Sequence, residues 1–232
     1  MMNNSGATPE QLGVRPVPAL AQRFLTHAFG WMFVGTLLTA AVAFAVQSSP
    51  TLTAFASRAY IFLFIGQIAI AWTIGGAIRR LNATAALGLF FVFAASFGLT
   101  VGLIVQYYTA ASVTTAFVGA SAMYGAAAIY GATTRRSLAS IGPVLMMGLI
   151  GLLVVSVLNL FLHSSQVSWL VSLVGVVIFT ALTAYDVQRI QNGTFAAAIG
   201  SMEKAAVVGA LVLYLDFINL FLFLLRLTGG RR

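Results

Sequence analysis

The sequence contains no cysteine and few charged residues. Without cysteine, neither a disulfide framework nor a thiolate metal site can form. Only 7% of the residues are charged, whereas a soluble globular domain carries roughly 25%. Hydrophobic residues make up 60% of the chain, and the mean hydropathy is +1.00. A water-soluble core cannot absorb so much apolar surface, so the composition predicts a protein of the lipid bilayer.

Seven stretches lack charge, except that the sixth and the seventh each contain one aspartate. Each is about the 20 residues that a helix needs to cross roughly 30 Å of hydrocarbon. The stretches are 24–47, 59–78, 83–105, 112–132, 141–162, 167–188 and 205–225. They predict an all-α, polytopic membrane protein with one seven-helix transmembrane domain over residues 23–232. Residues 1–22 are polar and are expected to form a flexible tail, and no soluble catalytic domain is expected.

The net charge of +8 would suggest a nucleic-acid partner in a soluble protein. Here the basic residues lie at the ends of the predicted spans, which is typical of membrane proteins, and we expect no nucleic-acid binding. A cytoplasmic N-terminus would place eight basic residues on the cytoplasmic side and four on the other. The eight are Arg15, Arg23, Arg79, Arg80, Arg135, Arg136, Arg189 and Lys204, and the four are Arg58, Arg226, Arg231 and Arg232. The balance favours this orientation, although the C-terminal arginines leave a re-entrant last segment as an alternative.

Two aspartates lie inside predicted spans, where a charged carboxylate costs on the order of 2.5–3.5 kcal/mol. Asp186 is near the end of the sixth span, and Arg189, one turn later, offers it an ordinary ion pair. Asp216 lies deep in the seventh span, and the amide of Asn219 on the same helical face could donate to it. Asp216 is therefore either a neutral, hydrogen-bonded structural acid or a functional group. Two carboxylates that meet in a low dielectric cannot both ionise cheaply, so such a pair would act as a proton switch whose state a nearby arginine could set.

Several segments resemble the Bax inhibitor family, also called the transmembrane Bax inhibitor motif family, in its bacterial branch. The most specific are YDVQRI (185–190) and LYLDFINLF (213–221) followed by LLR (224–226). Supporting segments are IRR (78–80), FGLT (97–100), FVGASA (117–122) and LNLF (158–161). The resemblance runs from about residue 22 to residue 227 and implies a seven-helix bundle with the last helix at its centre.

The resemblance also implies a function, a pH-sensitive calcium leak gated by a pair of aspartates. The pair corresponds to Asp186 and Asp216, which would also be weak ligands for passing Ca²⁺. The basic residue that engages the pair corresponds to Arg80, with Arg79 as the neighbouring alternative. Asn159 in the fifth span could line a pore, but we interpret it as an interhelical hydrogen bonder.

The expected partners are the lipid bilayer and calcium ions, with no resident cofactor and no enzymatic activity. The expected location is the bacterial inner (cytoplasmic) membrane. The alternative function is a non-conducting regulator that binds a membrane protease, or another membrane protein, through the N-terminal tail and the lipid-facing helices. In that case the aspartates would be structural.

Overall fold

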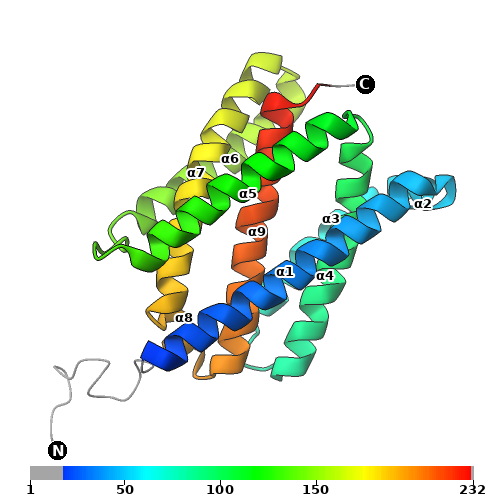
Figure 1. Ribbon diagram of the computed structural model, residues 1–232. Coiled ribbons are helices and arrows are strands. Elements are labelled where there is room, and N and C mark those ends of the chain that lie inside the picture. The colour runs from blue at the N-terminus through cyan, green and yellow to red at the C-terminus, as the bar shows by residue number, and fades with distance from the viewer. Residues whose placement is uncertain (1–17, 231–232) are drawn as a thin grey trace, which may run out of the picture.

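The fold is seen in a computed structural model that describes residues 18–230 (Figure 1). Within that range the chain forms nine α-helices and no strand. The helices are α1 (Pro18–Ser48), α2 (Pro50–Arg58), α3 (Tyr60–Gly76), α4 (Ala83–Val105), α5 (Ala110–Thr133), α6 (Gly142–Leu162), α7 (Ser165–Gln191), α8 (Thr194–Ile199) and α9 (Met202–Thr228). Residues 18–22 of the predicted tail belong to α1, and residues 1–17 lie outside the described part.

Six helices are long and apolar enough to cross a membrane: α1, α4, α5, α6, α7 and α9. The pair α2 and α3 counts as a seventh span if the two are taken together, although they meet at a bend of 70°. The prediction of an all-α, polytopic membrane protein is confirmed. The bend was not predicted. It lies at Ala59, which ends α2 and precedes α3. Ser49 and Pro50 instead begin α2 after α1, because the Ser49 side chain caps the helix by accepting from the Leu52 amide, and proline is tolerated in a first helical turn.

The last helix, α9, lies at the centre of the bundle. It packs against α1, α4, α5 and α7, and also against α3 and α8. Figure 1 shows α9 passing behind α1 and α5, with α7 and α4 on either side. In the most apolar window of α9, 67% of the residues are buried, against 6% for α6, which packs mainly on α7. The central position predicted for the last helix is confirmed, and α6 presents most of its surface to lipid.

Small residues allow the closest helix crossings, as expected where lipid gives helices no hydrophobic reason to associate. A Cβ added to Gly98 of α4 would lie 2.7 Å from the Cβ of Val42 in α1, and one added to Gly102 would lie 2.7 Å from that of Val46. The GxxxG step formed by Gly98 and Gly102 therefore allows α4 to pack closely against α1.

The connections fall at two opposite ends of the bundle (Figure 1). At one end, the Lys204 ammonium at the start of α9 donates to the Arg79 carbonyl in the turn after α3, across 3.2 Å. At the other end, the Thr109 amide before α5 donates to the Gly230 carbonyl after α9, across 3.2 Å. The helices thus alternate in direction, and the turns with Arg79, Arg80, Arg135 and Arg136 share one end.

Candidate functional site: two buried aspartates

Asp186 is buried near the end of α7 and has an ion-pair partner. Nη1 of Arg189 donates to its Oδ1 across 3.1 Å, one helical turn away. The Arg189 guanidinium also lies 5.1 Å from the ring centroid of Tyr185 and 4.5 Å from that of Phe195 in α8. Stacking between two rings holds this arginine in place beside the carboxylate. The ion pair predicted from the i, i+3 spacing is therefore present.

Asp216 lies in the middle of α9, about 21 Å along the helix from Met202 at 1.5 Å per residue. The residue is 4% exposed, and its Oδ2 has no hydrogen-bond partner among the described residues. The expected contact with Asn219 is absent, because the Asn219 amide donates to the Leu215 carbonyl of its own helix across 2.8 Å. Asparagine often bonds a carbonyl one turn back, and here that bond takes the amide away from the carboxylate. Asp216 is thus a buried acid without the compensation that such a group normally has.

The two aspartates lie on packed helices and act on each other electrostatically, although Asp186 is only about 8 Å from the end of α7 by helix rise. The third group near them is Tyr124 of α5, which is buried and within electrostatic range of both carboxylates. Its hydroxyl donates to the sulfur of Met32 across 3.4 Å, and its ring meets that of Phe217 edge-on at 5.4 Å. Sequence reasoning missed Tyr124, whose only signal is a large polar aromatic among the small residues of α5.

The end of α7 that carries Asp186 is held against α5 and the turn after it. A Cβ on Gly131 of α5 would collide with the backbone of Ala184, so the two helices touch there. The Gln188 amide oxygen accepts from the Leu138 amide across 2.7 Å, and its nitrogen donates to the Arg136 carbonyl across 2.9 Å. These contacts fix the rotation of α7 and thereby the direction in which Asp186 points.

The other predicted site residues lie elsewhere. Arg80 is exposed in the turn between α3 and α4, while the arginine beside the pair is Arg189. Arg79 donates to the Ala198 carbonyl of α8. Asn159 joins α6 to α7, with its amide donating to the Ser168 hydroxyl across 2.7 Å. The structure therefore pairs Asp186 with Arg189 and places Asp216 on the helix packed against α7, and the role of Arg80 stays a prediction.

The donor set limits what the site can hold. Among the described residues no group of three or more histidine, cysteine, aspartate or glutamate side chains converges. A cation at the pair would have two carboxylates as charged ligands, completed by carbonyl oxygens or water. Such oxygen ligands suit Ca²⁺, and two carboxylates make a weak site rather than a storage site.

Comparison with known proteins agrees with this architecture. Residues 21–232 match the family described as "Inhibitor of apoptosis-promoting Bax1". The chain belongs to the Bax inhibitor family. It is 40% identical to the inner membrane protein YbhL of Escherichia coli, with 91% of this chain and 93% of YbhL covered. An uncharacterized protein of Borreliella burgdorferi is 37% identical, with 92% and 94% covered, and the uncharacterized protein YrjE of Lactococcus lactis is 35% identical, with 89% and 90% covered. The resemblance stated from the sequence segments is confirmed.

Proposed function

We propose that this protein is a pH-sensitive calcium leak of the membrane, gated by the pair Asp186 and Asp216. The observation that carries the proposal is the unpartnered carboxylate oxygen of Asp216, buried in the central helix with a second carboxylate acting on it. A bundle that needed Asp216 only for packing would supply it with a hydrogen-bond donor. Buried carboxylates left in this state are typical of ion or proton pathways.

The mechanism follows from the charge on the pair. With a proton on the pair, the repulsion between the carboxylates is relieved, and α3, α7 and α9 hold the closed packing. When the proton leaves, two negative charges face each other in a low dielectric and favour either separation of α7 from α9 or entry of a cation. Ca²⁺ satisfies both carboxylates and is released readily from a site with two charged ligands, as conduction requires.

An arginine sets the balance between these states in this proposal. Arg189 neutralises Asp186 from its own helix, so it leaves the Asp216 charge without a partner. Arg80 would engage the pair only after the turn between α3 and α4 moved inward, because it is exposed there. We therefore assign Arg189 to the closed packing and retain Arg80 as the predicted latch of a second conformation.

The proposed location is the bacterial inner membrane with a cytoplasmic N-terminus. Support for the membrane comes from the similarity to YbhL, an inner membrane protein. Support for the orientation comes from the basic residues in the turns that share one end of the bundle, since cytoplasmic loops carry an excess of lysine and arginine.

Calcium flux into liposomes that contain a calcium-sensitive dye tests the proposal. The purified full chain should give a flux that rises with pH and exceeds that of empty vesicles. Both Asp186→Asn and Asp216→Asn should flatten this pH dependence, with folding checked by circular dichroism. A flux equal to that of empty vesicles at every pH, or one unchanged in both variants, refutes the leak.

The regulator alternative gives the opposite pattern. A protein that acts by binding a membrane protease would show no flux, and its cellular effect would vanish on deletion of residues 1–22 while both aspartate variants kept it. Measuring the cellular effect and the flux on the same three variants separates the two functions.

A further inference from the structure

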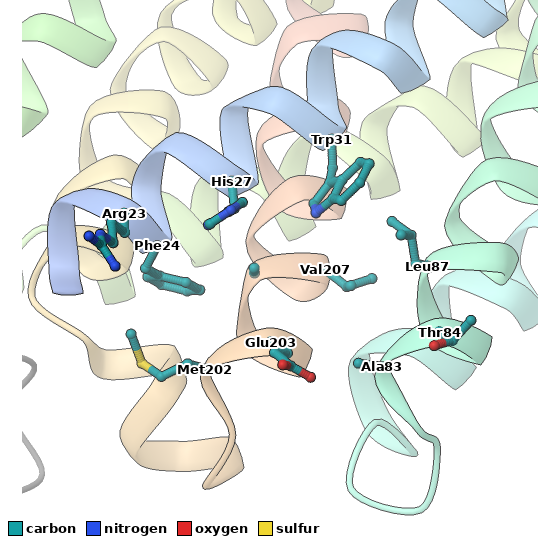
Figure 2. Close-up of a pocket in the computed structure, with 11 residues that line it drawn as sticks. Arg23, Phe24, His27, Trp31, Ala83, Thr84, Leu87, Met202, Glu203 and Val207 are labelled. Carbon is teal, nitrogen blue, oxygen red and sulfur yellow. The ribbon is translucent and has the colours of Figure 1, made fainter.

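A groove of about 470 Å³ lies between the N-terminal parts of α1, α4 and α9, away from the aspartate pair (Figure 2). Apolar side chains form most of its wall, among them Phe24 of α1, Leu87 of α4 and Val207 of α9. Val207 is nine residues before Asp216, or about 13 Å along α9, so the groove is separate from the proposed gate.

Charges of both signs line the same groove. Arg23 is on the first part of α1, and Glu203 is in the first turn of α9. Both side chains are exposed, and neither has an ion-pair partner within residues 23–230. Figure 2 shows Arg23 at one end of the groove and Glu203 between the first turns of α9 and α4. Opposite charges that line one groove without pairing suit a ligand that itself carries both signs.

Two further groups define the chemistry between these charges. His27 and Trp31 follow Arg23 along α1, and Figure 2 shows the His27 ring below α1 on the side of Phe24 and Trp31 on the side of Leu87 of α4. A histidine adds a hydrogen-bond donor next to the arginine. Trp31 lies eight residues inside the span that begins at Arg23 and adds an aromatic ring to the inner part of the groove. The groove therefore runs from a polar, charged end to an apolar part within one membrane leaflet.

We propose that this groove binds a zwitterionic phospholipid of the phosphatidylethanolamine class. Arg23 and His27 would contact the phosphate, and the Glu203 carboxylate would accept hydrogen bonds from the primary ammonium of the headgroup. One acyl chain would lie along Phe24, Leu87 and Val207. The inference does not depend on the calcium leak, because it uses none of the gating residues.

The headgroup chemistry makes the proposal specific. Phosphatidylcholine carries the same charges, but its quaternary ammonium has no N–H to donate to Glu203. Phosphatidylglycerol keeps the phosphate and lacks the cation, so it leaves the Glu203 carboxylate facing a ligand with no positive group. A charge-assisted hydrogen bond is worth about 1.5–3 kcal/mol, so phosphatidylethanolamine should bind roughly tenfold or more tighter than either lipid.

Native mass spectrometry of the full chain in detergent, titrated with these three lipids with identical acyl chains, measures the preference. Glu203→Gln should remove the preference for phosphatidylethanolamine over phosphatidylcholine and leave the affinity for phosphatidylcholine unchanged. Arg23→Gln should lower the affinity for phosphatidylethanolamine and for phosphatidylcholine by roughly tenfold. Arg135→Gln removes an exposed arginine outside the groove and serves as the matched control, with no change expected.

Three outcomes would overturn the proposal. One is the same affinity for all three lipids in the wild type and in both groove variants. Another is a preference for phosphatidylglycerol that Glu203→Gln strengthens, because the groove would then take an anionic lipid. The third is equally tight binding of glycerophosphoethanolamine, which has no acyl chains, because the apolar wall would then contribute nothing.

Discussion

The Arg189 guanidinium contacts the Asp186 carboxylate at 3.1 Å along one face of α7. Asp216, on the packed helix α9, has a buried carboxylate oxygen without any hydrogen-bond partner in residues 18–230. The two acids thus differ in compensation although both are buried. The ion pair with Arg189 offsets the cost of burying the Asp186 charge, whereas no partner offsets that cost for Asp216.

Asp216→Asn should stabilise the folded protein in alkaline buffer. The substitution removes a buried charge that has no partner and keeps the shape of the side chain, so we expect a gain of about 1–3 kcal/mol. In mildly acidic buffer the difference from wild type should shrink, because a protonated aspartate is neutral like asparagine. Thermal unfolding in detergent at both pH values measures the effect. Equal stability of variant and wild type in alkaline buffer would mean that Asp216 is already neutral or solvated there.

Arg189→Gln and Arg80→Gln test which arginine controls the pair. Loss of Arg189 leaves Asp186 as a second buried charge without a partner, so the calcium flux should become higher than wild type and its pH dependence should shift. Arg80→Gln removes an exposed guanidinium and should leave the resting flux within error of the Arg135→Gln control. A shifted pH profile for Arg80→Gln alone would instead support the latch predicted from the family resemblance.

Gly131→Ala should loosen the contact between α5 and α7. The added Cβ would meet the Ala184 backbone, so the helices must separate, and we expect a loss of about 1–3 kcal/mol. Gly125→Ala is the matched control in the same helix, because nothing lies within 4 Å of its added Cβ. That control should be neutral or stabilising by roughly 0.5–1 kcal/mol, since alanine favours helix over glycine. If the unfolding temperatures of the two variants change by the same amount, the close crossing of α5 and α7 at Gly131 is contradicted.

The sequence predicts the main spans well because lipid imposes long apolar runs on them. The fifth predicted stretch, 141–162, is the helix Gly142–Leu162. The two short helices were not predicted for different reasons. The region of Pro50–Arg58 is rich in serine and threonine and lacks a span's hydropathy, and the six residues of Thr194–Ile199 are too few to show a period. Neither helix has the long apolar run that a bilayer imposes on a span, so neither could be predicted from such a run.

The site was predictable only where a residue is anomalous or its partner is near in sequence. Asp216 is a lone acid in an apolar helix, and Arg189 lies one turn from Asp186, so both could be recognised. Asn219 shares a face with Asp216, yet helical spacing does not decide between a carboxylate and a nearby carbonyl as acceptor. Tyr124 of α5 lies within electrostatic range of the pair, and proximity between helices that are distant in sequence leaves no local pattern.

Thr39 and Tyr214 should be energetically coupled. Their hydroxyl oxygens are 2.7 Å apart between α1 and α9, and Thr39 also contacts the Ala94 carbonyl of α4 at 2.8 Å. Tyr214→Phe should lower the free energy of unfolding by about 0.5–1.5 kcal/mol. Thr39→Val should lower it by about 1–3 kcal/mol, because the buried tyrosine hydroxyl then loses its partner. The double variant should lose less free energy of unfolding than the two single variants lose together. A double-mutant cycle should therefore give a coupling energy of roughly 0.5–2 kcal/mol. Thr36→Val, whose hydroxyl bonds only its own helix at Met32, is the control and should not couple to Tyr214.

The absence of cysteine from the chain makes the orientation directly measurable. Ser137→Cys lies in the turn between α5 and α6, and Ser165→Cys lies at the start of α7, at the opposite end of the bundle; both positions are exposed. If the N-terminus is cytoplasmic, a membrane-impermeant maleimide added to intact cells should label Ser165→Cys and spare Ser137→Cys. Permeabilised cells should label both, which controls for reactivity. Labelling of Ser137→Cys alone in intact cells would place the arginine-bearing turns outside, against the positive-inside rule.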